Sequence, residues 1–232
     1  LHQLAPLADP RWDSFVGSHP GSSIFHSTAW LRALHETYGF EPLAFTTSTP
    51  DTELRDAVVF CRVNSWLTGH RLVSLPYSDH CEPLAEIEVV REVCAALERE
   101  VRERRLRYFE LRPLRQLACQ DAFCRPVGRY CMHVLDLTPD LAAIYNGFHP
   151  SSIQRKIRRA AREGLTYREG RSEDLLDAFY RLQARTRRRH GVPVQPAVWC
   201  RNLIRLFGDA LKIRVAMSGD EAAASILTIR HK

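Results

Sequence analysis

Four residues that can move protons or bind metal stand in a row where a strand is expected to end. They are Asp79, His80, Cys81 and Glu82, within the segment LVSLPYSDHCEPL of residues 72–84. Ligands of α/β proteins usually bind at the carboxyl ends of strands, so Asp79 or His80 could hold an amine or deprotonate it. The alternative is a structural loop in which Asp79 caps its own backbone. The sequence leaves both interpretations open.

Metal binding and thiol chemistry are less favoured for this row. Adjacent residues cannot close one tetrahedral metal site, and the chain has no second ligand cluster of the CxxC or HxxxH kind. A nucleophilic Cys81 would need a base held beside it, which a sequence cannot show. We therefore predict no metal site here.

A basic helix, SSIQRKIRRAAREG, supplies the second candidate site. Four arginines recur at i, i+3, i+4 and i+7 on one side of the helix, opposite Ile153 and Ile157. These are Arg155, Arg158, Arg159 and Arg162. Like charges on one stripe repel each other, so the stripe is either a solvated face or a site for a phosphate-bearing ligand. That ligand would be a nucleotide, a pyrophosphate-lipid or an RNA backbone.

Positive charge is concentrated around this helix. Residues 151–189 contain twelve Lys and Arg against five acids, a balance of +7, whereas the whole chain carries +6. A second cluster, TRRRHGVPVQP, lies at a helix end, where the helix dipole favours cations without any ligand. Its Arg188 and His190, together with Lys156, join the stripe as candidate phosphate-binding residues.

The periodicity of apolar residues indicates the elements that position these groups. In the first half it predicts helices at 10–16, 28–38 and 86–105, strands at 42–46, 57–64, 70–75, 107–111 and 130–137, and a turn at 67–69. In the second half it predicts helices at 138–147, 151–164, 172–189 and 197–207, and strands at 165–168, 211–217 and 222–230. Ser151 or Ser152 is expected to cap the basic helix. This order predicts a mixed α/β layer fold.

Helices followed by a strand hairpin occur in both halves, which predicts one kind of domain built twice, over residues 1–145 and 146–232. The chain starts with Leu1 and stops inside an expected strand, so we expect a fragment whose second domain is incomplete.

Composition indicates a globular protein, with 45% hydrophobic and 26% charged residues among 232. No apolar run approaches the roughly 18 residues of a membrane helix. Seven cysteines without a CxxC pair are typical of a reducing compartment, so the cytoplasm is expected.

Several segments resemble FemAB-type proteins, a branch of the GNAT superfamily. FHPSSIQRKIRRAAREGL, FYRLQARTRRRHGVPVQP and AAASILTIRHK are similar to the second domain of that family. GSSIFHSTAWLRALHETYGFEP and RLVSLPYSDHCEPL look like its first domain. The resemblance implies tandem GNAT-like domains and transfer of an acyl or aminoacyl group to an amine of a cell-envelope or polysaccharide precursor. The implied donor is acyl-CoA or aminoacyl-tRNA, and the implied acceptor is a small or lipid-linked precursor.

One departure from the GNAT pattern bears on the donor. The glycine-containing loop that binds the pyrophosphate of CoA should fall between Leu75 and Glu86, where this chain has PYSDHCEPLAE. Without glycine, backbone amides cannot approach a pyrophosphate closely, so the first domain is not expected to bind CoA. The functional alternative is a non-catalytic module that binds nucleic acid through the basic helix of residues 151–163. The aromatic residues nearby are not interleaved with the arginines as a stacking platform requires, which counts against that module.

Overall fold

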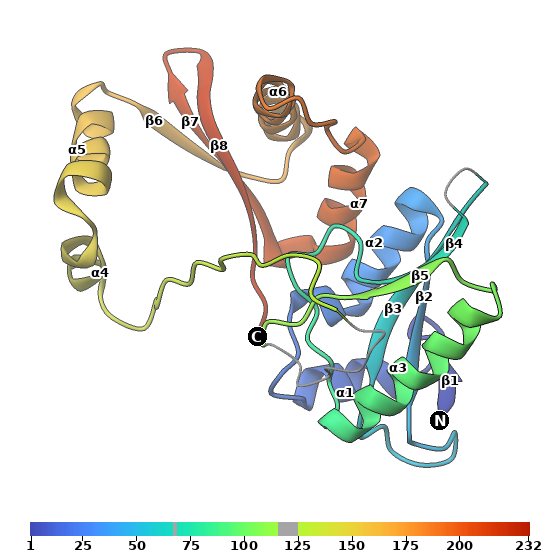
Figure 1. Ribbon diagram of the computed structural model, residues 1–232. Coiled ribbons are helices and arrows are strands. Elements are labelled where there is room, and N and C mark those ends of the chain that lie inside the picture. The colour runs from blue at the N-terminus through green and yellow to red at the C-terminus, as the bar shows by residue number, and fades with distance from the viewer. Residues whose placement is uncertain (67–68, 116–124) are drawn as a thin grey trace. The chain divides into compact units, whose positions relative to one another are not determined.

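The computed structural model describes residues 1–66, 69–115 and 125–232 (Figure 1). Residue contacts divide the chain into two compact units. The first comprises Leu1–Arg125, Gln195–Leu211 and Ile229–Lys232, and the second comprises Pro126–Val194 and Lys212–Thr228. The expected domain boundary between residues 145 and 146 stays a prediction. The first two residues of the turn expected at 67–69 lie outside the described residues.

The first unit contains a five-stranded sheet in the order β1-β2-β3-β4-β5. Its strands are β1 (His2–Leu4), β2 (Glu41–Thr46), β3 (Val58–Ser65), β4 (Gly69–Ser74) and β5 (Tyr108–Leu111). Neighbouring strands are antiparallel except β4 and β5, which are parallel with Ser74 opposite Leu111. A parallel pair needs a crossover, and helix α3 (Ile87–Arg102) supplies it. The carboxyl ends of β4 and β5 therefore meet at one edge of the sheet.

Helix α3 forms the main core of this unit with the sheet. Its three-and-four spacing places Val90, Val93 and Leu97 on one side, where they pack with Phe45 of β2 and Phe60 of β3. Each of these five side chains is at most 3% exposed. Burying a side chain of this size contributes about 2 kcal/mol, so the α3 face holds the sheet, and the ends of β4 and β5, in place.

Helix α2 (Thr28–Tyr38) begins and ends at the expected residues for identifiable reasons. The Ser27 hydroxyl accepts a hydrogen bond from the Trp30 amide at 3.2 Å, and Gly39 ends the helix with a left-handed φ of 68°. The unit also contains α1 (Trp12–Ser18), the short 3₁₀ turns Ile24–His26 and Gly208–Ala210, and α7 (Ala197–Phe207). Helix α7 packs on α2, with the Trp30 and Trp199 rings edge to face and their centroids 5.2 Å apart.

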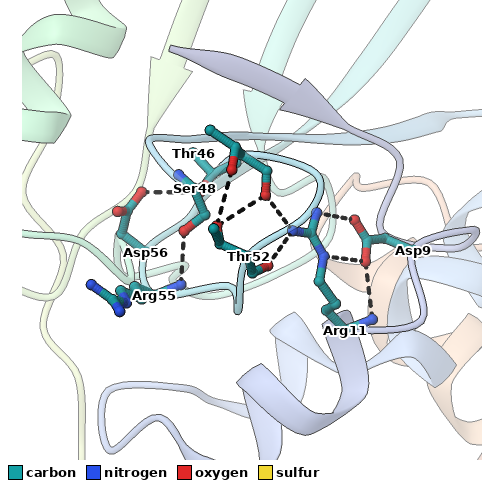
Figure 2. Close-up of polar contacts among 8 residues, drawn as sticks. Asp9, Arg11, Thr46, Ser48, Thr52, Arg55 and Asp56 are labelled. Atoms are coloured by element: carbon teal, nitrogen blue, oxygen red, sulfur yellow. Dashed lines mark hydrogen bonds and ion pairs between the residues drawn. The ribbon is translucent and has the colours of Figure 1, made fainter.

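The long connection between β2 and β3 is fixed by polar contacts (Figure 2). The Arg11 guanidinium donates to the carbonyl oxygens of Thr49 and Thr52 at 2.7 Å each, while Asp9 orients the guanidinium through a third 2.7 Å contact. Asp56 accepts a hydrogen bond from the Thr46 hydroxyl at 3.2 Å at the other end of the loop. These contacts fix both ends of the connection, and Leu54 within it is buried.

The second unit contains a three-stranded sheet in the order β6-β7-β8. Its elements are α4 (Leu141–Gly147), the π-turn η2 (Pro150–Gln154), α5 (Arg155–Arg162), β6 (Thr166–Gly170), α6 (Glu173–Arg189), β7 (Leu211–Ser218) and β8 (Glu221–Ile229). Strands β6 and β7 are antiparallel, with Gly170 opposite Ile213. The predicted mixed α/β fold with two sheets is confirmed.

Two expectations about local structure are wrong. Residues 130–137 form no strand, and Tyr130 and Val134 are 97% and 79% exposed, because no described strand pairs with this segment. Cys131, which lies in this segment, is exposed as well. Neither Ser151 nor Ser152 caps the basic helix, since both lie inside the π-turn that leads into α5. Among the described residues, no helix is long and apolar enough to cross a membrane.

Candidate functional site

The loop that follows β4 lies against the carboxyl end of β5. The Cys81 amide donates to the carbonyl oxygen of Arg112 at 2.8 Å. The Arg112 guanidinium returns along the same loop and donates to the carbonyl oxygens of Leu75 and Ser78 at 3.1 and 3.2 Å. The loop therefore occupies the ligand-binding position expected from the sequence, and its backbone conformation is held from β5.

Cys81 belongs to the structure of the loop and not to its chemistry. The side chain is 1% exposed, and burial raises the pKa of its thiol to about 12. Its sulfur lies 3.4 Å from Nε2 of His26. Nδ1 of His26 accepts a hydrogen bond from the Ser23 amide at 3.0 Å, so the proton is on Nε2, which donates to the Glu82 carbonyl oxygen at 2.9 Å. A ring nitrogen that already carries a proton cannot activate the thiol.

The two carboxylates at the ends of the row, Asp79 and Glu82, differ in whether they have a hydrogen-bond partner. Glu82 is engaged, because its Oε2 accepts a hydrogen bond from the Leu114 amide at 2.6 Å. Asp79 is exposed and makes no hydrogen bond or ion pair with any residue that the structure describes. The capping role considered for Asp79 is filled by Ser78, whose hydroxyl donates to the Leu75 carbonyl at 2.8 Å. The carboxylate of Asp79 is thus available for a ligand.

His80 is half-buried beside Asp79, with its ring edge-on to Phe25 at a centroid distance of 5.1 Å. Burial lowers the pKa of His80, although the charges of Asp79 and Glu82 oppose the shift. The imidazole is therefore neutral at pH 7 and able to accept a proton. Its Nδ1 is buried without a hydrogen-bond partner among the described residues.

Tyr77 is a residue of this loop that the sequence reasoning missed. The residue is 46% exposed, and its ring stacks on Tyr38 with centroids 4.6 Å apart, next to Phe40 and Trp199. Its φ is 59°, in the left-handed region that disfavours residues with a Cβ. The signal available was an aromatic residue just before Ser-Asp-His at a strand end.

Three of the candidate phosphate-binding arginines come together in the second unit. Arg155, Arg158 and Arg162 line an open hollow with Pro150, Ser151 and Ala161. Arg159 points elsewhere and pairs with Glu163 at 2.6 Å, so it offsets part of the repulsion along the stripe. Lys156, Arg188 and His190 are exposed and do not line the hollow. Helices α5 and α6 lie well apart, joined through β6, so the two basic clusters are separate (Figure 1).

The apolar side of α5 is not buried in the described structure, since Ile153 and Ile157 are 42% and 44% exposed. The excess of positive charge in the chain is confined to the second unit.

This unit holds 15 Lys and Arg against 9 acids, whereas the first unit has 18 of each, so the whole net charge of +6 lies in the second unit. Among the described residues, no group of three or more His, Cys, Asp and Glu could hold a metal ion.

Two comparisons with known proteins bear on this arrangement. Residues 149–232 match the family described as the acetyltransferase (GNAT) domain. The crystal structure of FemX superposes with a TM-score of 0.60 at 13% sequence identity, over 93% of this chain. The chain has a FemX-like GNAT fold. No curated protein matches the sequence.

The resemblance to FemAB-type proteins is thereby confirmed for the fold. This chain spans 57% of the length of the FemX chain. The matching domain supports an acyltransferase, while neither comparison supports the nucleic-acid-binding module.

Proposed function

We propose that this protein transfers an acyl or aminoacyl group to an amine of a cell-envelope or polysaccharide precursor. The observation that carries the proposal is the loop after β4, where the exposed Asp79 and the neutral His80 stand together in a GNAT-type fold. A carboxylate holds an ammonium group, and a neutral imidazole accepts a proton from it. An amine must be held near the acyl carbon and must lose a proton before it attacks, and these two groups can serve those two needs.

The reaction that fits these groups forms one bond and breaks one. The amine reaches the site protonated, binds at Asp79, and loses a proton to His80. Its lone pair then attacks the acyl carbonyl carbon, the new C–N bond forms, and the bond from the carbonyl carbon to the donor's sulfur or oxygen breaks. The proton held by His80 returns to the leaving group, and the second proton, which nitrogen loses as the C–N bond forms, passes to water.

The loop after β4 is a poor site for the donor's pyrophosphate. The amides of Ser78, Cys81 and Leu84 donate to the carbonyl oxygens of Leu75, Arg112 and Ala57. Those N–H groups are therefore not free to cradle phosphate oxygens, which agrees with the lack of glycine in the segment. We assign phosphate groups of the substrates to Arg155, Arg158 and Arg162, the arginines around the hollow in the second unit.

Amide formation is the test. The intact protein is incubated with acetyl-CoA or with aminoacyl-tRNA and a set of amines, including amino sugars and muramyl peptides, and the products are analysed by mass spectrometry. We expect an N-acyl product with one of the two donors. A protein that binds RNA in a salt-dependent way and forms no amide with either donor would instead favour the nucleic-acid-binding module.

A further inference from the structure

Tyr77 is held in an unfavourable backbone conformation by contacts on both sides of it. Its φ of 59° brings Cβ close to the backbone, which is uncommon outside Gly, Asn and Asp. Arg112 bonds to the carbonyl oxygens of Leu75 and Ser78, the residues that flank Pro76 and Tyr77. Residues held in strained backbone conformations cluster at ligand sites, where the surrounding contacts offset the strain energy and keep the side chain in its functional position.

The ring of Tyr77 forms the open end of an aromatic wall. It stacks on Tyr38 with an interplanar angle of 24°, and Phe40 lies nearly parallel to it at 15°. Trp199 supports the same group, with a centroid distance of 6.0 Å to Tyr77. Since Tyr77 remains 46% exposed, the wall presents a rigid apolar surface to solvent.

A negative charge stands next to this surface. Asp79 follows Tyr77 by two residues, so the two Cα atoms are at most about 7 Å apart. The Asp79 carboxylate is exposed and unpaired among the described residues. An electron-rich ring face beside a free carboxylate favours a ligand with a flat apolar side and a positive charge. It disfavours the phosphates of a nucleotide or of CoA, which Asp79 would repel.

We propose that the acceptor is an amino sugar, whose C–H face stacks on Tyr77 and whose ammonium group binds Asp79. A pyranose ring supplies a rigid apolar face, and a hexosamine carries the charge on the same ring. A flexible alkyl amine would engage Asp79 but leave Tyr77 uncovered. The inference rests on the proposed function, because it names the acceptor at the same loop.

Binding of three amines separates the two contacts. Glucosamine carries ring and charge, N-acetylglucosamine carries the ring alone, and cadaverine carries the charge on a flexible chain. Saturation-transfer NMR on the intact protein measures the affinity of each, expected in the millimolar range for ligands this small. In wild type, saturation should concentrate on protons of one face of the sugar ring.

Tyr77→Asn is the informative variant, because Asn removes the ring and tolerates a left-handed φ. Tyr77→Asn and Asp79→Asn should each weaken glucosamine binding by about fivefold or more. N-acetylglucosamine should respond to Tyr77→Asn alone, and cadaverine to Asp79→Asn alone. Tyr130→Asn, which changes a 97% exposed tyrosine outside the site, should leave all three unchanged.

Glucosamine binding that is no tighter than cadaverine binding, or that is unchanged in Tyr77→Asn, overturns the amino-sugar assignment. If Tyr77→Asn fails to fold, saturation spread evenly over both faces of the sugar in wild type overturns it as well. Amide formation on a peptide amine at the wild-type rate in Tyr77→Asn would reject the amino sugar and keep the acyltransferase. Tyr77-dependent glucosamine binding without amide formation from either donor would keep the sugar site and reject the transferase.

Discussion

Replacing Arg112 with Met tests whether the loop after β4 is held from β5. The change removes two hydrogen bonds from a guanidinium to the carbonyl oxygens of Leu75 and Ser78, at 3.1 and 3.2 Å. It also removes an ion pair with Glu110 at 2.6 Å. Met keeps most of the length and apolar contact of the side chain, so the loss is largely polar.

The magnitude follows from how exposed these contacts are. Hydrogen bonds to charged groups contribute about 1.5–3 kcal/mol each when buried. Arg112 is 33% exposed and its ion pair with Glu110 is accessible to water, so we expect these contacts to contribute less than the sum of their buried values. The Leu75 carbonyl keeps the Ser78 hydroxyl as a donor at 2.8 Å, which leaves one carbonyl without a partner. We therefore expect a loss of about 2 kcal/mol in the free energy of unfolding.

Urea unfolding and steady-state kinetics measure the two consequences. The control is Arg62→Met, which removes an exposed pair with Glu41 at 3.9 Å and should cost about 0.5 kcal/mol or less. Because the loop positions Asp79 and His80, kcat/KM of Arg112→Met should fall by about tenfold or more in molecules that remain folded. If Arg112→Met costs no more than Arg62→Met and leaves kcat/KM unchanged, the loop is not held in the way described.

Three further predictions concern the hollow, a buried histidine and a buried thiol. Replacing Arg155 and Arg158 with Gln should weaken binding of a phosphate-bearing substrate and reduce its salt slope by about two, with unfolding free energy unchanged, as titrations at several salt concentrations will show. Burial lowers the pKa of His26 to about 4 from 6.5, so the unfolded state binds more protons between these values. Unfolding free energy should thus fall by about 1.4 kcal/mol per pH unit as pH drops from about 6 to 4, and His26→Gln should remove this slope in urea titrations. Cys81→Ala should cost about 1 kcal/mol or more of stability yet leave turnover per folded molecule intact, and a large loss of turnover would return the thiol to the mechanism.

Local signals predicted the elements whose own residues determine their ends. Helix α2 lies at the predicted residues 28–38, and the contacts that determine its two ends, at Ser27 and Gly39, are local in sequence. Residues 130–137 have a similar strand pattern but form no strand, since strand formation depends on a partner strand that no local signal specifies.

The site was predicted in part. Asp79 and His80 are candidates from residue type and position at a strand end, and their catalytic role stays a prediction. What distinguishes them from Cys81 and Glu82 is contacts of the latter two with distant residues. Cys81 lies against His26, and Glu82 accepts a hydrogen bond from the Leu114 amide. Neither partner can be inferred from sequence spacing. Tyr77 escaped prediction because a left-handed φ on Tyr has no sequence signature.

The most direct test of the proposed function is the kinetics of Asp79→Asn and His80→Ala in the intact protein, with Asp220→Asn as a control. Asp79 and Asp220 are both exposed, but Asp220 lies in the turn between β7 and β8. We expect each site variant to lower kcat/KM for amide formation by about a hundredfold, with a melting temperature near wild type, while Asp220→Asn keeps both. Site variants that melt several degrees lower but turn over at the wild-type rate per folded molecule would show that the loop is structural.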